Sequence, residues 1–376
     1  MIPFEWHART RTVFGPGTLS RLGELALQLG IRRALLVADE GLVSAGHVAR
    51  VTRTLETSGI AVVPFHDFGE NPDSAMVEQG RAVAADAQPD GLLAVGGGSS
   101  LDCAKGINFV LTNGGTVADY RGHRETARPM LPMIGVPTTA GTGSEAQSYA
   151  VLADATTHAK IACGAPGAAF RVAVLDPELT VSAPRSVTAA AGMDALAHAV
   201  ETWVTTRRTP LSDMYAGEAW RLLSANYLRA LTAPDNLDVR GAMLLGAHLA
   251  GAAIEQSMLG ATHACANPLT QYYGTVHGVA IALLLPAVVR WNARVVAARY
   301  AALAEAGGDR RRTETLVARL EDFVAAGEFP GSLGNAGIPE PDLPHLAEEA
   351  ARQWTGQFNP RRFDAGAALE IYAAAY

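Results

Sequence analysis

Four short apolar runs in the N-terminal half of the sequence constrain the fold more than any other feature. The stretches between the first three runs carry helical periodicity, so we expect strands and helices to alternate. Such alternation indicates a parallel, doubly wound sheet with helices on its faces. A last short strand is expected to end at Leu175, and the sequence becomes almost wholly helical from about Val187. The four runs are residues 34–38, 60–65, 91–95 and 132–136.

This change of pattern divides the sequence near Pro184. We expect an α/β domain with a mostly parallel sheet over residues 1–183 and an all-α domain over residues 184–376. A length of 376 residues, 49% of them hydrophobic and 18% charged, fits a globular protein of two domains. The longest apolar runs, such as residues 279–289, fall short of the ~20 residues that a membrane span needs. We therefore expect core helices and no membrane partner.

Charge and cysteine content exclude several classes of partner. A formal net charge of -7, with lysine and arginine scattered along the chain, provides no basic patch for a nucleic acid. Cys103, Cys163 and Cys265 form no CxxC pair, which argues against a disulfide framework and suits a reducing compartment. The start of the chain has no basic region followed by an apolar run. We therefore expect a cytoplasmic protein without a signal peptide.

Two segments of the helical half carry an acid and three imidazoles that could close on one metal ion. Asp194 and His198 are four residues apart, so on a helix they share one face, although a solvated face would explain this pair equally well. His263 and His277 stand among small and apolar residues, where a neutral imidazole needs a partner for each nitrogen. A lone histidine of this kind is usually a satisfied core residue. Two of them, with the acid and imidazole upstream, favour a site for Fe²⁺ or Zn²⁺.

Three polar features beside the apolar runs favour a dinucleotide. Asp39 follows the first run, where its carboxylate could accept hydrogen bonds from a ribose or serve equally well as a helix N-cap. Residues 96–105 read as a glycine turn and a helix start, which suit a pyrophosphate, although Leu101 stands where the usual fingerprint has its third glycine. Residues 137–145 are rich in hydroxyls and glycine, although such loops usually only turn the chain.

Together these motifs resemble the iron-dependent, or group III, alcohol dehydrogenases over nearly the whole chain. The glycine turn with Asp102 and Lys105, the hydroxyl-rich loop, residues 192–198 and residues 277–280 are similar to that family's signatures, in the same order. The resemblance implies a metal-dependent, NAD(P)-linked oxidoreductase that interconverts a small alcohol and its aldehyde or ketone by hydride transfer. It also implies that the metal, iron(II) or alternatively zinc, is held by Asp194, His198, His263 and His277.

The resemblance further implies a set of cofactor-binding residues, with Asp39 at the adenosine ribose. We expect NAD(H) rather than NADP(H), because a carboxylate there would repel a 2′-phosphate. A homodimer is also expected, since an exposed edge of the N-terminal sheet could pair across a two-fold axis. The implied cofactor-binding residues are Asp39, Gly97, Gly98, Ser99, Asp102, Thr138, Thr139, Thr142, Ser144, Lys160 and Leu179.

Two segments depart from the family pattern. Many members have a second histidine four residues after the third metal ligand, where it is taken to line the substrate site and help move protons, and this chain has Asn267 there. An amide cannot titrate, so we expect Asn267 to take part in catalysis by positioning a substrate or water. Residues 254–257 replace a Phe-Ser-Asn of many members, which predicts an altered pocket wall.

Three other functions compete with this one. A dehydroquinate synthase-like lyase uses NAD transiently, but its metal site resembles Glu-His-His, whereas this chain has one acid and three histidines. A maleylacetate reductase-like enzyme looks metal-independent, so an intact ligand set argues against it. A non-catalytic protein that keeps a nucleotide and a metal as structure would oxidise no alcohol.

Overall fold

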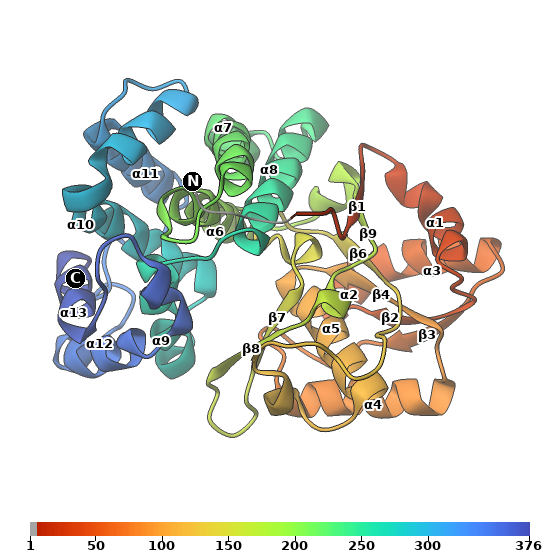
Figure 1. Cartoon of the computed structure of the whole chain (residues 1–376). Helices are drawn as coiled ribbons and strands as arrows, with labels where there is room; N and C mark the ends of the chain where they lie inside the picture. Colours follow the sequence, from red (N-terminus) through yellow and green to blue (C-terminus); the bar gives the residue numbers. More distant parts are fainter. Residues whose placement is uncertain (1–5) are drawn as a thin grey trace. The chain divides into compact units, whose positions relative to one another are not determined.

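The computed structural model describes residues 6–376, which form two compact units. An α/β unit contains the described residues up to 139 together with 143–183, and a helical unit contains residues 140–142 and 184–376. In Figure 1 the α/β unit is coloured from red to yellow-green and the helical unit from green to blue. The expectation that no signal peptide starts the chain rests largely on residues 1–5, which lie outside the described part.

The α/β unit is built on a six-stranded sheet in the order β1-β9-β6-β4-β2-β3, in which every neighbouring pair is parallel. The parallel sheet predicted from the alternating pattern is therefore confirmed, and each of the four apolar runs forms one of its strands. The strands are β1 (Arg11–Phe14), β2 (Arg33–Val37), β3 (Ala61–Phe65), β4 (Gly91–Gly96), β6 (Met133–Pro137) and β9 (Val172–Leu175).

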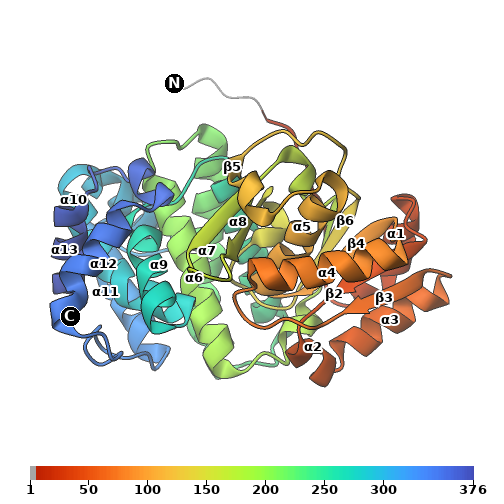
Figure 2. The ribbon, with the colours of Figure 1, turned by 90° about the horizontal axis from the view of Figure 1, so that it is seen from below.

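Helices cover both faces of this sheet because its side chains alternate between two cores. Leu35 and Val37 of β2 belong to a core that includes residues of α4 (Ser74–Ala87) and α5 (Gly98–Asn113). Ala34 and Leu36 point to the opposite face, whose core includes α1 (Leu22–Gln28) and α3 (His47–Thr57). Figure 2 shows α4 lying in front of the strands.

A second, smaller sheet in the α/β unit was not predicted from the sequence. Its order is β5-β8-β7, and β7 and β8 are antiparallel. Lys160 begins β8, so this expected cofactor residue lies on the small sheet. The strands are β5 (Gly122–His123), β7 (Tyr149–Ala153) and β8 (Lys160–Gly164), and the short helix α2 (Glu40–Ser44) completes the unit's regular helices.

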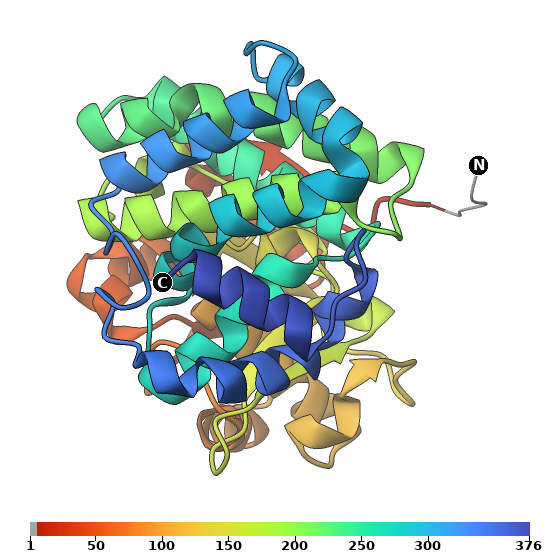
Figure 3. The ribbon, with the colours of Figure 1, turned by 90° about the vertical axis from the view of Figure 1, so that its left-hand side faces the viewer.

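The helical unit packs its long helices side by side around the buried helix α6, as Figure 3 shows. Two of its helices, α8 and α10, are long and apolar enough to cross a membrane by length and composition, but 67% of the most apolar window of each is buried. They are the core helices that the sequence predicted. The helices are α6 (Arg185–Val204), α7 (Pro210–Thr232), α8 (Leu237–Glu255), α9 (Ala261–Tyr273), α10 (His277–Ala306), α11 (Thr313–Ala326), α12 (Leu343–Ala351) and α13 (Ala365–Ala374).

A fully buried lysine ties α5 to the chain that follows β6. The Lys105 ammonium is 0% exposed and donates to the carbonyl and the hydroxyl oxygen of Ser144, both at 2.8 Å, and to the carbonyl oxygen of Tyr149 at 2.5 Å. The Asp102 carboxylate lies 3.6 Å from the same nitrogen. A buried charge is tolerated only with such partners, so Lys105 fixes the loop that carries the expected cofactor residue Ser144.

We predict that Lys105→Met destabilises the protein by roughly 3 kcal/mol or more, because methionine leaves two buried carbonyl oxygens without their donor. The midpoint of urea unfolding, followed by circular dichroism, measures the change. Arg81→Met is a matched control, since Arg81 pairs with Glu78 at the surface of α4. An exposed pair contributes about 1 kcal/mol or less. Equal midpoints for the two variants would contradict the structural role of Lys105.

Candidate functional site

Helix α6 carries the first two predicted metal ligands on one buried face. Asp194 and His198 are each 4% exposed, so a solvated helix face is excluded. The Nε2 atom of His198 lies 3.4 Å from Asp194 Oδ1, as the spacing of four residues on a helix allows.

The other two histidines reach the same carboxylate oxygen from separate helices. His263 lies in the first turn of α9, and its Nε2 is 3.3 Å from Asp194 Oδ1. His277 is the first residue of α10, and its Nε2 is 3.6 Å from that oxygen. The side chain of His277 is 31% exposed, whereas the other three are 6% exposed, so the cluster is accessible from the side of His277.

A close helix contact places His277 within reach. A Cβ atom on Gly278 would lie 2.2 Å from the backbone oxygen of Ala190 in α6, which is far inside contact distance. Only glycine permits this approach without moving a backbone, so the first turn of α10 lies directly against α6.

The donor set and its spacing fit a divalent metal. Ligand atoms about 2.1 Å from a tetrahedral metal lie about 3.4 Å from one another, and the three nitrogen-to-oxygen distances of 3.3, 3.4 and 3.6 Å match that separation. Ligand atoms of Asp194, His263 and His277 also lie within 4.8 Å of one another. His198 lies outside that group of three, although its Nε2 is 3.4 Å from Asp194 Oδ1 and its ring is stacked on His263 with centroids 4.8 Å apart.

Burial and charge keep Asp194 and His198 in the protonation states that a metal requires. Burial would raise the pKa of Asp194, but the three imidazoles outweigh it and hold that pKa well below its usual range. Burial lowers the pKa of His198 to about 4. At neutral pH the acid is therefore ionised and His198 is neutral, and these are the forms that ligate metals.

One residue of this site was not predicted from the sequence. Glu201 lies on α6, and its Oε2 is 2.5 Å from His263 Nδ1, on the side of the ring away from Asp194. Burial lowers the pKa of His263, but the carboxylates of Glu201 and Asp194 raise it to about 9. The sequence held a signal for this residue, because Glu201 falls on the same helix face as Asp194 and His198.

Asn267 lies one turn after His263 on α9 and is 7% exposed. Its Nδ2 donates a hydrogen bond of 3.0 Å to Oε1 of Gln353, a residue that the sequence did not single out. This contact holds the amide in one orientation. Ile254, at the end of α8, is 6% exposed, and Glu255 after it is partly exposed.

In the α/β unit, the carboxyl ends of β2 and β4 bring several expected cofactor residues together. Asp39 is the N-cap of α2, as one of its two interpretations required, with Oδ1 accepting from the Leu42 backbone N–H at 3.2 Å. Its Oδ2 accepts from the Ser100 hydroxyl at 3.1 Å. Gly97 is the N-cap of α5, and the Thr138 backbone N–H donates to the carbonyl oxygen of Gly96 at 3.0 Å.

Asn71, which was not predicted, connects two further cofactor candidates. Its backbone N–H donates to the Ser99 hydroxyl at 3.2 Å, and its Oδ1 accepts from Lys160 Nζ at 2.6 Å. Burial lowers the pKa of Lys160. The Ser144 hydroxyl donates to Asp102 Oδ1 at 2.5 Å.

The other expected cofactor residues make none of the hydrogen bonds described above. Leu179 is fully buried in the core that α1 and α3 share, so it exposes no surface to a ligand. Thr139 lies beside Gly97, since a Cβ atom there would be 3.2 Å from the Thr139 hydroxyl. Gly98 begins α5, and Thr142 belongs to the three-residue segment that groups with the helical unit.

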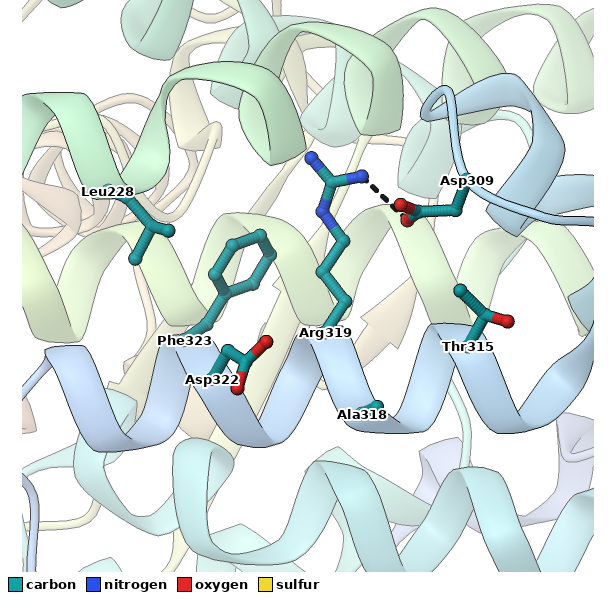
Figure 4. Close-up of a pocket in the computed structure, with 7 residues that line it drawn as sticks. All are labelled: Leu228, Asp309, Thr315, Ala318, Arg319, Asp322 and Phe323. Atoms are coloured by element: carbon teal, nitrogen blue, oxygen red, sulfur yellow. Dashed lines mark hydrogen bonds and ion pairs between the residues drawn. The ribbon is translucent and has the colours of Figure 1, made fainter.

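An open pocket of about 280 Å³ in the helical unit contains none of the predicted residues (Figure 4). The positively charged residue in its wall, Arg319, already donates hydrogen bonds to Asp309 Oδ2 at 2.6 Å and to the Ser224 carbonyl oxygen at 2.8 Å. We therefore do not assign a function to it. The pocket is lined by Leu228, Asp309, Thr315, Ala318, Arg319, Asp322 and Phe323.

Comparison with known proteins agrees with both halves of the chain. Residues 9–177 match a family described as iron-containing alcohol dehydrogenase, and residues 188–376 match the C-terminal part of the Fe-containing alcohol dehydrogenase family. The chain is 34% identical to a 1,3-propanediol dehydrogenase of Klebsiella pneumoniae, covering 99% of both chains. It is 32% identical to an NAD-dependent methanol dehydrogenase of Bacillus methanolicus, covering 93% of this chain and 94% of that one.

The fold agrees as well. A crystal structure of 1,3-propanediol oxidoreductase superposes with a TM-score of 0.96 at 34% identity and covers 100% of both chains. Two family matches that span nearly the whole chain, and relatives above 30% identity over at least 94% of their own length, lead to one conclusion. The chain belongs to the iron-containing alcohol dehydrogenase family of oxidoreductases.

Proposed function

We propose that this chain holds a divalent metal, iron(II) in the first instance, on Asp194, His198, His263 and His277. With it the chain interconverts a small alcohol and its aldehyde or ketone by hydride exchange with NAD(H). The observation that carries the proposal is the convergence of three imidazole Nε2 atoms on one carboxylate oxygen, at 3.3 to 3.6 Å. One oxygen and three nitrogen donors suit Fe²⁺ or Zn²⁺.

The chain's own contribution to this chemistry is a set of donors that is already in place. A divalent metal bound there supplies a Lewis acid that polarises a carbonyl group and lowers the pKa of a coordinated hydroxyl group. Asp194 contributes the negative charge, and buried helices α6 and α9 keep the side chains of Asp194, His198 and His263 out of water. The exposure of His277 leaves one side of the cluster open to a small substrate.

Asn267 then acts by position rather than by proton transfer. Its amide has no titrating proton at neutral pH, and its contact with Gln353 fixes the direction of its donor and acceptor atoms. We propose that it holds a substrate or a water by hydrogen bonds.

The α/β unit supports NAD(H) as the cofactor. The glycine turn at the start of α5 offers backbone amides for a pyrophosphate, and Asp39 stands at the end of β2, where a ribose is expected. One relative, the methanol dehydrogenase of Bacillus methanolicus, is described as NAD-dependent. The proposed metal ligands suit a metal that activates an alcohol or a carbonyl compound, and the relatives are named as dehydrogenases. Both points favour a dehydrogenase over the dehydroquinate synthase-like lyase and over a non-catalytic protein that binds nucleotide and metal.

We also propose a homodimer that forms at the β1 edge of the sheet. β1 is the outermost strand on that side and has one neighbour, β9, so an identical strand could extend the sheet across a two-fold axis. The three cysteines are free and buried, which fits the reducing cytoplasm.

We predict that Asp194→Ala and His263→Ala each weaken metal binding by more than about 100-fold, since loss of a direct ligand costs at least as much as loss of its supporting partner. Asn267→Ala is the matched control, because Asn267 lies on α9 one turn from His263 and should keep its metal. Elemental analysis of protein purified with added Fe²⁺ or Zn²⁺ measures the outcome. Variants that retain as much metal as the parent would rule out this site.

The same preparations test the reaction. Parent protein stripped of metal and reloaded with a single ion should oxidise NADH in the presence of small aldehydes, and Asp194→Ala should not. A metal-loaded parent that binds NADH but converts none of a panel of aldehydes and alcohols would be a structural binder and no enzyme.

We predict that Asp39→Asn raises the ratio of kcat/KM for NADPH to that for NADH by about tenfold or more, because it removes a charge that repels a 2′-phosphate. Asparagine still caps α2 through its Oδ1, so the local fold is preserved. Asp364→Asn, at the N-cap of α13, is the control and should leave the ratio unchanged. A parent that uses NADPH as well as NADH would refute the assignment of Asp39.

A further inference from the structure

We propose that Glu201 is a positioning residue that fixes the tautomer and the ring orientation of His263 for metal binding. The inference rests on the metal site proposed above and adds a residue that touches neither metal nor substrate. Glu201 is 4% exposed and lies on α6, three residues after His198.

Both oxygens of the Glu201 carboxylate are occupied by donors from the start of α9. Oε2 is 2.5 Å from His263 Nδ1, and Oε1 accepts from the Thr262 backbone N–H at 2.6 Å. A Cβ atom on Gly260 would lie 3.2 Å from Oε1, so the glycine before α9 leaves room for this approach. The carboxylate therefore accepts hydrogen bonds from the backbone of α9 and from the His263 imidazole at the same time.

This contact decides which nitrogen of His263 faces the metal site. An ionised carboxylate only accepts hydrogen bonds, so Nδ1 must carry a hydrogen and donate it to Glu201. Nε2, which lies 3.3 Å from Asp194 Oδ1, is then the nitrogen whose lone pair is free for a metal. Supporting carboxylates of this kind fix the tautomer and orientation of ligating histidines.

An amide cannot replace the carboxylate, because it has one accepting oxygen for two donors. If the amide oxygen of the Glu201→Gln variant faced Thr262, its NH₂ group would face His263 and select the tautomer with hydrogen on Nε2, which closes the ligating nitrogen. If the amide oxygen faced His263, the NH₂ group would oppose the Thr262 N–H. The first arrangement blocks the ligating nitrogen, and the second leaves the buried Thr262 N–H without an acceptor.

The histidine beside it is supported differently. His198 is buried, and the backbone of Gly141 acts on its ring as a hydrogen-bond partner. The orientation of His198 also depends on its helix and on stacking with His263, with ring centroids 4.8 Å apart. Loss of the Glu201 contact would therefore disturb two ligands of the set.

Asn359 offers a matched control at the same helix end. Its Oδ1 accepts from the Ala261 backbone N–H at 3.3 Å, and it exchanges hydrogen bonds with Asn292 at 3.0 and 2.8 Å. Asn359 thus supports the start of α9 as Glu201 does, but none of its hydrogen bonds involves a histidine. Asn359→Ala shows how much metal affinity is lost when only that support is removed.

The test compares metal-free parent, Glu201→Gln, Asn359→Ala and Asp194→Ala proteins, each titrated with Zn²⁺ and with Co²⁺. We expect Glu201→Gln to weaken binding about 10- to 100-fold and to change the visible absorption of bound Co²⁺, which reports its ligands. Asn359→Ala should lower the melting temperature of the metal-free protein but leave the affinity and the Co²⁺ spectrum as in the parent.

The outcomes separate this inference from the metal site itself. A parent that binds no more metal than Asp194→Ala overturns both proposals. A parent that binds metal while Glu201→Gln binds it equally well, or while Asn359→Ala loses as much affinity as Glu201→Gln, overturns the role of Glu201 alone. If Glu201→Gln does not fold, ¹⁵N NMR of the Zn²⁺-bound parent decides, since His263 must carry its hydrogen on Nδ1, and hydrogen on Nε2 would refute the proposal.

Discussion

Two carboxylates buried inside a helical unit are the constraint on which the rest of this site depends. Asp194 and Glu201 are each 4% exposed, and removing such charges from water costs several kcal/mol unless other groups compensate. The compensation comes from imidazoles on three helices and from the backbone N–H of Thr262 at the start of α9. The helices therefore have to meet at one point, and the proposed metal site is the place where they do.

The two carboxylates contact opposite nitrogens of the same ring because His263 lies between them. One ring nitrogen faces Glu201 at 2.5 Å and the other faces Asp194 at 3.3 Å, so the ring is held from both sides. His277 is held differently, by the contact of Gly278 with the backbone of α6. Side-chain hydrogen bonding thus fixes the buried His263, and helix packing fixes His277, the most exposed of the four candidate ligands.

Sequence patterns revealed those parts of the fold and site that depend on local spacing. β2, β4 and β6 are nearly continuous apolar runs because both faces of a central parallel strand are buried. β3 is an edge strand that is apolar all the same, whereas the edge strand β1 begins with Arg11 and Thr12 and leaves no such pattern. Asp194 and His198 share a helix turn, whereas Glu201 and His263, or Asn267 and Gln353, meet across 62 and 86 residues. Contacts of that range depend on tertiary packing.

The structure shows one of the two interpretations of Asp39 that the sequence left open, the helix N-cap, and the ribose-binding role stays a proposal. Its oxygens already serve the fold, one as the cap of α2 and one as the acceptor for Ser100. An ionised carboxylate offers about four lone-pair sites, so these two contacts leave capacity for ribose hydroxyls. The structural contacts even favour that role, because they hold the carboxylate at the end of β2 before a cofactor arrives. Capping of α2 is therefore compatible with the proposed recognition of a ribose by the same side chain.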